Sequence, residues 1–304
     1  TVSGHGASEL TLDIGRFVLS AQVEDALDLG LSIQKTGATP TSYIVEAVGD
    51  VFSADHAIPR TFSRGEHNRL VDAALWSPTP GFLSGELIVT NTDLTSAGSG
   101  LGSEDGSDTV VVSGSGVNES IASFAPVAGQ TTFAIDLGVR ERSAEPEESV
   151  TTIYNAGGFP QTTADLVITG IEAFGDHQTI TIPALEGSSI EGGQFVLVEV
   201  VGDRSGPLGV YEVQYTFETA DEPIPGAGPA ETLMLSVSME LVASSCPGDV
   251  NGSGGVDLAD LNLVLGNFGL ASGATMGDGD ASGDGSVDLA DLNIVLGGFG
   301  SACP

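Results

Sequence analysis

Residues 248–269 read GDVNGSGGVDLADLNLVLGNFG, and residues 279–300 read GDASGDGSVDLADLNIVLGGFG. Sixteen of the 22 aligned positions are identical, so this part of the chain is a duplicated unit. Each copy opens with a twelve-residue run rich in polar residues and glycine, and continues with apolar residues at helical spacing. The pattern predicts a loop followed at once by a short helix, twice over, with the two helices packed face to face.

The twelve-residue runs place oxygen groups at loop positions 1, 3, 5, 7, 9 and 12, with glycine at position 6, as a calcium loop requires. Ca²⁺ takes roughly six to eight oxygen ligands, and a tightly folded loop can bring them together. Position 12 is Asp in both copies, which is shorter than the usual Glu. We predict two Ca²⁺ ions as cofactors of this module. The predicted ligands are Asp249, Asn251, Ser253, the Gly255 carbonyl, Asp257 and Asp260 in the first loop, and Asp280, Ser282, Asp284, the Ser286 carbonyl, Asp288 and Asp291 in the second.

The two cysteines of the chain, Cys246 and Cys303, lie on either side of the duplicated unit. We predict a disulfide between them, made in an oxidising compartment, with a pair of reduced thiols as the alternative. A module of this size has little core, so the metal and the disulfide together would supply stability that packing cannot. A purely structural role for calcium is therefore open beside a role in docking.

The residues between 246 and 303 resemble a dockerin, the duplicated loop-helix module that docks onto a cohesin β-sandwich in cellulosome-type assemblies. In dockerins the residues that read the partner lie at loop positions 10 and 11. The resemblance implies partner contacts by Leu258, Ala259, Leu289 and Ala290. Because the same pair occurs in both copies, it also implies two binding orientations related by about a half turn. The Phe-Gly helix ends and the flanking cysteines depart from the cellulosomal forms and leave the partner's identity open.

The residues before 244 alternate short apolar runs with turn-rich stretches, in one series up to about residue 120 and a second from about 130. Their Val, Ile and Thr content, and the 43 Gly and 14 Pro of the chain, favour antiparallel β-sandwiches. Segments 31–37, 43–49 and 85–91 resemble segments 150–157, 166–172 and 209–215, which indicates tandem sandwiches. We predict a mainly β chain with sandwiches over 1–125 and 126–244 and the small helical calcium module over 245–304.

Both sandwiches resemble immunoglobulin-like modules of the ASPM–SPD-2–Hydin type and the choice-of-anchor domains of exported bacterial proteins. The residues that carry this resemblance are a strand with an Asn-x-Gly ending at 150–158 and an L-x-I-x-G-I strand at 166–171. The resemblance implies an architecture and no activity. Two polar stretches, 141–148 and 221–229, are expected to be a charged loop and a proline-stiffened loop inside the second sandwich.

Acidic residues dominate the charge, with 42 Asp and Glu against 8 Lys and Arg and a formal net charge of −34. Such a chain is repelled by phosphate backbones, which excludes nucleic-acid binding. The chain begins with Thr1 rather than Met, and no run approaches the ~18 consecutive apolar residues of a membrane span. We expect a secreted chain, extracellular or at the cell surface, whose signal peptide has been removed.

Weaker patterns give alternatives. The acidic stretch 103–108, with Asp93 nearby, could hold a further calcium ion, although a solvated loop is the simpler interpretation. Asp55 and His56 could join a serine in a triad on paper, but the chain has no G-x-S-x-G elbow. Paired carboxylates of the glycosidase type stay open, because their separation in space is invisible in a sequence. Trp76 lies in an apolar run and is expected in the core rather than on a sugar-binding platform.

The sequence thus predicts a non-catalytic structural protein that assembles through its C-terminal module. Calcium would order the two loops, and the Leu-Ala faces would then dock onto a cohesin-like or immunoglobulin-like β-sandwich of a neighbouring chain, which could be another copy. A head-to-tail contact of this kind builds a filament or surface layer when its rotation does not close. The alternative is an accessory glycan- or surface-binding protein anchored through its dockerin to a separate cohesin scaffold. An exposed aromatic strip would favour that alternative.

Overall fold

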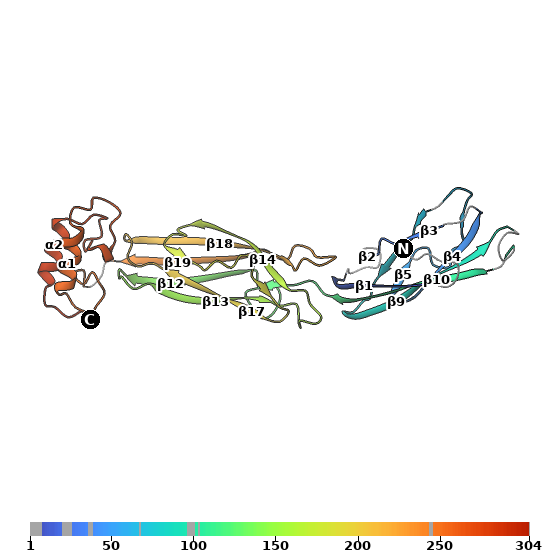
Figure 1. Cartoon of the computed structure of the whole chain (residues 1–304). Coiled ribbons are helices and arrows are strands. Elements are labelled where there is room, and N and C mark those ends of the chain that lie inside the picture. The colour runs from blue at the N-terminus through green and yellow to red at the C-terminus, as the bar shows by residue number, and fades with distance from the viewer. Residues whose placement is uncertain are drawn as a thin grey trace.

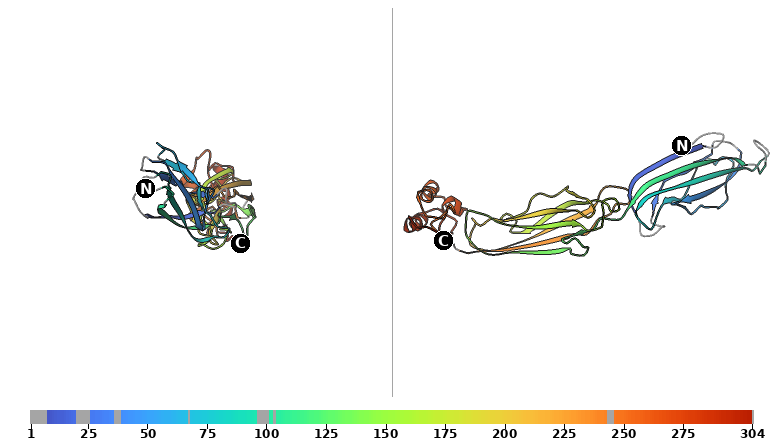
Figure 2. Two further views of the ribbon diagram at one scale, coloured as in Figure 1. Left: turned by 90° about the vertical axis from the view of Figure 1, so that its right-hand side faces the viewer. Right: turned by 90° about the horizontal axis from the view of Figure 1, so that it is seen from below.

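The computed structural model describes residues 8–19, 26–35, 39–66, 68–95, 101–102, 104–242 and 246–303. It has three bodies in line, two β-sandwiches followed by a small helical module at the C-terminal end (Figure 1). In Figure 2 the left view looks along the long axis, where the bodies overlap within a narrow outline, and the right view shows the elongated arrangement from below. The prediction of a mainly β chain with sandwich domains and two short C-terminal helices is confirmed. None of the helices in the described residues has the length and apolar character needed to cross a membrane.

The first sandwich has a five-stranded sheet in the order β1-β10-β9-β4-β6 and two smaller sheets, β2-β8-β5 and β3-β7. Its core mixes residues of the large and small sheets, among them Phe17, Tyr43, Leu75 and Leu87. Alternating buried and exposed positions along β9 reflect the two faces of a half-buried strand. The strands are β1 (Ser8–Val18), β2 (Leu27–Asp28), β3 (Ser32–Gln34), β4 (Thr41–Gly49), β5 (Val51–Ser53), β6 (Arg60–Phe62), β7 (Asn68–Leu70), β8 (Ala73–Leu75), β9 (Gly81–Asp93) and β10 (Glu104–Val117).

The second sandwich has a five-stranded sheet in the order β12-β19-β18-β14-β16 and a four-stranded sheet, β11-β13-β17-β15. Between them lies the largest core of the chain, in which Ile153, Leu166, Phe217 and Leu235 are fully buried. The strands are β11 (Ala122–Ser123), β12 (Thr132–Glu141), β13 (Glu147–Asn155), β14 (Leu166–Gly175), β15 (Ile180–Thr181), β16 (Ser189–Ile190), β17 (Phe195–Gly202), β18 (Gly209–Asp221) and β19 (Leu233–Val242).

The two five-stranded sheets share one topology, because β1, β10, β9, β4 and β6 correspond in order to β12, β19, β18, β14 and β16. A repeated bulge marks the first strand of each. Gly15 and Gly138 adopt left-handed φ angles of 67° and 76° and donate their N–H groups to Asp13 and Asp136, at 3.0 and 2.8 Å. The strand register shifts at this point in both copies. The duplication that the sequence predicts therefore extends to a detail of the backbone.

Two features differ from the sequence prediction. Each large sheet is mixed rather than antiparallel, because β1 runs parallel to β10 and β12 runs parallel to β19. The short strand β11 pairs with β13, so it lies with the second sandwich although it precedes the predicted boundary at 125/126. Alternation of apolar residues indicates a strand but carries no information on the direction of its partner, which explains the first difference.

An apolar cluster and an ion pair join the two sandwiches. Val18 and Val117 of the first sandwich pack with Ala164 and Ile224 of the second in a small buried cluster. Beside this cluster an ion pair joins Arg16 to the second sandwich, with 2.7 Å between the guanidinium and the carboxylate of Glu222. The stretch 221–229, which the sequence predicts as a stiffened loop, lies at the end of β18 and in the loop before β19, and this loop reaches the first sandwich (Figure 1). The segment before β14 contributes as well, because Arg16 donates to the carbonyls of Pro160 and Thr163, at 3.4 and 3.0 Å.

The C-terminal module consists of α1 (Leu258–Asn267), the short 3₁₀ helix η2 (Met276–Asp278) and α2 (Leu289–Gly298). A disulfide joins Cys246 to Cys303, as predicted. The core between the helices is small and consists of Val250, Val256, Val264, Ala274, Met276, Ala281, Val287 and Val295.

Candidate calcium-binding and docking site

The first calcium loop is held closed by two buried carboxylates. Asp249, at position 1, accepts the N–H groups of Ser253 and Gly254, at 2.9 and 2.8 Å. Asp260, at position 12, is fully buried and accepts the N–H groups of Asn251 and Asp257, at 3.1 and 2.8 Å. The first and last ligand positions therefore both reach back into the loop and fix its backbone.

The second loop repeats this arrangement. Asp280, at position 1, accepts the N–H groups of Gly283 and Gly285, at 2.8 and 2.9 Å. Asp291, at position 12, is fully buried and accepts the N–H groups of Ser282 and Asp288, both at 2.8 Å. The position-6 glycines, Gly254 in the first loop and Gly285 in the second, have left-handed φ angles of 88° and 84°, which explains why glycine is needed there.

Position 9 of each loop is also the residue that starts the helix. Asp257 and Asp288 are the N-caps of α1 and α2, and their side chains accept the N–H groups of Ala259 and Ala290, both at 2.7 Å. Asp260 and Asp291 complete a capping box at each helix start. Loop and helix are thus one hydrogen-bonded unit, because the side chain at loop position 9 holds the backbone N–H of position 11.

The donor set fits a hard divalent cation. Both loops offer oxygen ligands only, from carboxylate, amide, hydroxyl and carbonyl groups, which suits Ca²⁺. In the part of the chain that the structure describes, Asp249, Asp260 and Asp291 are buried carboxylates without an ion-pair partner, whereas Asp280 pairs with Arg142. Buried charges are usually paired or bound to a metal, so a bound cation would stabilise these three carboxylates.

Within the described residues, no three His, Cys, Asp or Glu side chains lie close enough together to hold a metal ion, and this includes the loop carboxylates. They are turned instead toward backbone N–H groups, as the hydrogen bonds above show. At the exposed position 5 of the second loop, the hydroxyl and the N–H of Ser286 hold the pKa of Asp284 below its usual range, at 2.6 and 2.9 Å from the carboxylate. This side chain is therefore an ionised oxygen donor at neutral pH.

The predicted docking residues lie on the surface of the module. Leu258 and Leu289 are each 61% exposed, and Ala259 and Ala290 beside them are exposed as well. The structure adds further apolar residues at equivalent positions of the two copies. These are Leu265 and Leu296, which lie one heptad after Leu258 and Leu289 on the same helix faces, and Phe268 and Phe299 at the helix ends.

The sequence reasoning missed these four residues, although a signal for them was present. Val264 and Val295 are core residues, and a helix turns by about 100° per residue, so the next residue must face away from the core. Leu265 and Leu296 follow them directly. A large apolar residue retained in both copies at an outward position indicates a surface with a function.

The two copies are related by an approximate two-fold arrangement within the module. Gly269, after α1, donates to the carbonyl of Val287 in the second loop, and Gly300, after α2, donates to the carbonyl of Val256 in the first, both at 2.8 Å. Each helix end therefore closes on the other copy's loop. The apolar surface is doubled by the same relation.

The other predicted sites give a mixed picture. Asp93 is buried and its Oδ2 atom has no hydrogen-bond partner in the described residues, but Ser103 of the nearby acidic stretch lies outside those residues. Asp55 pairs with Arg60 at 2.7 Å, and Nδ1 of His56 accepts the N–H of Ala47 at 3.0 Å, so neither side chain is arranged for a triad.

The aromatic residues also differ in part from expectation. Trp76 is half-buried at the end of β8 rather than fully in the core. An aromatic pair lies on the outer face of β13 and β17, where the rings of Tyr154 and Phe195 are 5.3 Å apart; Phe195 is 52% exposed and Tyr154 is half-buried. Leu197, on the same face, is 56% exposed.

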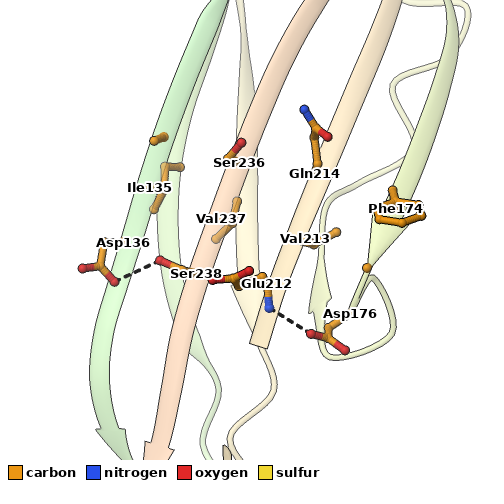
Figure 3. A pocket seen from close by; sticks show the side chains of 12 residues that line it. Ile135, Asp136, Phe174, Asp176, Glu212, Val213, Gln214, Ser236, Val237 and Ser238 are labelled. Carbon is orange, nitrogen blue, oxygen red and sulfur yellow. Dashed lines mark hydrogen bonds between the residues drawn. The ribbon is translucent and has the colours of Figure 1, made fainter. Parts of the chain in front are cut away.

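A shallow groove of about 740 Å³ crosses the outer face of the large sheet of the second sandwich (Figure 3). Two of its carboxylates already accept hydrogen bonds: Ser238 donates to Asp136 at 3.2 Å, and Asp176 accepts the N–H of Glu212 at 2.9 Å. Phe174 at its edge is the single aromatic residue among those that line it. The groove therefore offers no aromatic platform for a sugar ring.

No protein-family model matches the chain, and no curated protein matches its sequence. Solved structures are similar only at a low level. The adhesive subunit CfaE of the CFA/I fimbria of enterotoxigenic Escherichia coli is 8% identical, with a TM-score of 0.34 over 80% of this chain and 99% of that chain. A protein of unknown function from Porphyromonas gingivalis is 15% identical, with a TM-score of 0.27 over 68% and 88%. Drosophila N-cadherin EC1-4 is 11% identical, with a TM-score of 0.31 over 76% and 50%. TM-scores this low support no conclusion about function.

Proposed function

We propose that this chain is a non-catalytic extracellular assembly protein whose calcium-loaded, dockerin-like module docks onto a β-sandwich of a neighbouring chain. The observation that carries the proposal is the doubled apolar surface of the module. Leu258 and Leu289 are equally exposed at 61%, and Leu265 and Leu296 at 53% and 51%. A module with so small a core would gain stability by burying these leucines, so their exposure in both copies is explained by a partner.

The loops and the docking surface are coupled through the helix starts. The ligand positions listed above would hold one Ca²⁺ in each loop, where the ion would neutralise the crowded carboxylates and draw them together. Asp257 and Asp288 belong both to the loops and to the helix caps, next to Leu258 and Leu289. Ordering of the loop therefore orders the first turn of the helix, which carries the docking residues.

The doubled surface supports two binding orientations. A partner that contacts Leu258, Ala259 and Leu265 from the first copy would find Leu289, Ala290 and Leu296 in the same relation after a half turn. Substitution of the docking residues in one copy should therefore weaken docking without abolishing it.

A copy of the same chain offers a suitable partner, because the first sandwich presents its sheet faces at the opposite end of the chain from the module (Figure 1). The contact would be head-to-tail, and a rotation that fails to close gives a filament or layer. The disulfide between Cys246 and Cys303 supports an extracellular setting, since disulfides persist in oxidising compartments.

The proposal is tested by sedimentation and negative-stain electron microscopy of the full chain in millimolar Ca²⁺ and after chelation. We expect filaments or sheets that disappear with the chelator. Single particles under both conditions would overturn self-assembly, and a sandwich on a different protein would then be sought as the partner.

Variants sharpen the test. Leu258→Asp and Leu289→Asp together should abolish calcium-dependent assembly, whereas each alone should leave it weakened, because a lost leucine contact lowers affinity by roughly tenfold or more. Leu270→Asp is the matched control, since Leu270 is exposed on the same module but has no apolar counterpart in the second copy. If Leu270→Asp lost as much calcium-dependent assembly, the loss would come from added negative charge on the module and not from the docking leucines.

A second candidate function is favoured by the pair of Tyr154 and Phe195. The exposed ring of Phe195 and the half-buried ring of Tyr154, beside Leu197, form a small aromatic surface on the outer face of β13 and β17. Such a surface suits a sugar ring, as in a glycan-binding accessory protein. Retention on immobilised glycans that Phe195→Ala abolishes, without change in assembly, would support this function.

A further inference from the structure

The module rests on the end of the second sandwich through a joint that centres on Arg142. This residue follows β12 directly and is 4% exposed. Its Nε atom donates to the carbonyls of Ser205 and Gly206, at 3.1 and 3.0 Å, within its own sandwich. Its two terminal nitrogens donate across the joint to Asp280, one to the backbone carbonyl at 2.6 Å and one to Oδ2 at 3.1 Å. One planar guanidinium thus binds both bodies at once.

Both calcium loops face this joint with their position-4 glycines. A Cβ atom on Gly283 would lie 3.3 Å from the Arg142 guanidinium, and one on Gly252 would lie 3.8 Å from the side chains of Ser143 and Ala144. A backbone hydrogen bond of 3.1 Å from Met276 to the carbonyl of Ser205 adds to the contact. The loops therefore point toward the sandwich, while the apolar docking surface stays exposed.

The two loops differ in charge, and Arg142 contacts the more acidic one. The second loop carries four carboxylates, at positions 1, 5, 9 and 12, whereas the first carries three, because its position 5 is Ser253. Arg142 contributes one positive charge to the loop with the additional carboxylate. Asp280, the position-1 ligand of that loop, is 1% exposed, so its interaction with Arg142 is weakly screened.

We infer that Arg142 is a positioning residue for the second calcium loop and a latch between the sandwich and the module. It holds the loop against the sandwich with or without calcium, and so fixes the direction in which the docking surface points. Its positive charge also lowers the calcium affinity of the second loop relative to the same loop without it. This inference rests on the calcium sites of the proposed function, but not on docking to a partner.

Calcium binding at each loop can be followed separately by NMR. The amide protons of Gly254 and Gly285 bond to Asp249 and Asp280, at 2.8 and 2.9 Å, so each reports on the position-1 ligand of its own loop. The full chain is titrated with Ca²⁺ as wild type, Arg142→Gln, Arg142→Lys and Arg140→Gln. The last variant is the control, because Arg140 pairs with Glu147 inside the second sandwich.

In Arg142→Gln we expect the Gly285 midpoint to move to a lower calcium concentration by roughly threefold to tenfold, the effect of one charge at a partly screened site, while the Gly254 midpoint stays in place. Arg142→Lys keeps the charge and should leave the Gly285 midpoint near that of the wild type. A Gly285 midpoint in Arg142→Gln that is unchanged, or that moves to higher calcium, would overturn the electrostatic part of the inference.

The latch itself is measured by the distance between spin labels at Glu199→Cys, on β17, and Ser272→Cys, on the module, both exposed positions. In chelator we expect a narrow distance distribution for wild type and Arg140→Gln, and a broad one for Arg142→Gln and Arg142→Lys. Equal widths in all four would overturn the latch. If neither glycine responded to calcium, the proposed function would fail, and the distance measurement would still decide on the latch.

Discussion

Val18 donates its backbone N–H to the carbonyl of Pro225 at 2.9 Å, which ties the last residue of β1 in the first sandwich to the β18–β19 loop of the second. Gly226 follows at a left-handed φ of 81°, and a Cβ atom there would lie 2.8 Å from the Val18 carbonyl oxygen. The proline-rich loop therefore packs closely against the first sandwich rather than extending into solvent. It makes the angle between the sandwiches a property of the fold.

This contact predicts that the chain bends when the loop is disturbed. Ile224→Asp places a charge in the cluster with Val18, Val117 and Ala164, where an unpaired charge is unfavourable. We expect small-angle X-ray scattering to show a shorter and broader distribution of end-to-end distances than in the wild type. Pro223→Ala, at an exposed position of the same loop, is the control. An unchanged scattering curve for Ile224→Asp would mean that the cluster does not hold the angle.

The disulfide should contribute strongly to the stability of the module. Cys246 and Cys303 close a loop with a sequence separation of 57, for which chain-entropy arguments give about 4 kcal/mol. Replacement of both by Ser should lower the unfolding temperature of the module in calcium, and in chelator the module should unfold ahead of the sandwiches. Calorimetry of the full chain separates these transitions. A single unshifted transition in the double variant would contradict the prediction.

Substitutions at the N-cap residue Asp257 can separate the effect of its hydrogen bond on stability from the effect of its charge on calcium binding. Asp257→Ala removes the acceptor for the Ala259 N–H and should destabilise the module by about 1 kcal/mol even in chelator. Asp257→Asn keeps an acceptor and should preserve stability in chelator, but lose part of the stabilisation by calcium because a ligand charge is gone. Urea unfolding with and without Ca²⁺ measures both. Identical behaviour of the two variants in chelator would argue against the cap.

Tyr215 predicts a loss of stability at alkaline pH. Burial raises the pKa of its hydroxyl above the usual 10.0, and the hydroxyl donates to the carbonyl of Ile180. The unfolded chain therefore ionises first as the pH rises. The stabilisation is fully present below pH 10 and is lost as the pH approaches the higher pKa of the folded state.

Tyr215→Phe tests this prediction in the second sandwich. It should destabilise that sandwich at neutral pH by about 1 kcal/mol through the lost hydrogen bond, and should flatten the alkaline decline in urea-unfolding free energy. Tyr43→Phe in the first sandwich is the comparison for a general effect of tyrosine removal. A decline of equal slope in Tyr215→Phe would assign the alkaline sensitivity to other groups.

Much of the C-terminal module could be predicted because its information is local. Asp257, at loop position 9, adjoins Leu258 in the sequence, so the start of the helix at the end of the loop follows from the loop spacing, whereas the docking role proposed for Leu258 is implied by the resemblance to dockerins. The long strands of both sandwiches were also predictable from their apolar runs, since a half-buried strand exposes every second side chain, whereas short strands such as β6, β11 and β16 carry too few residues for such a pattern. The pairing of β14 with β18 follows from the same repeat that relates them to β4 and β9.

Long-range contacts could not be predicted in this way. Arg142 lies in the stretch 141–148, which reads as a charged surface loop, and only the folded chain brings it to Asp280. The parallel pairing of β1 with β10 joins residues about one hundred positions apart, so the local sequence pattern does not indicate it. The exposure of Leu265 and Leu296, by contrast, could be predicted from the sequence. If Val264 and Val295 face the core, the residue that follows each of them on the helix faces the solvent.

The parallel edge pairs have a mechanical consequence. In each sandwich the first long strand runs beside the last, β1 with β10 and β12 with β19. When such a body is pulled from its two ends, the paired strands slide past each other along their length. Their hydrogen bonds, evenly spaced in a parallel ladder, are then loaded together in shear instead of being peeled apart one at a time. A chain built from two of these bodies in series is suited to carry tension along its axis.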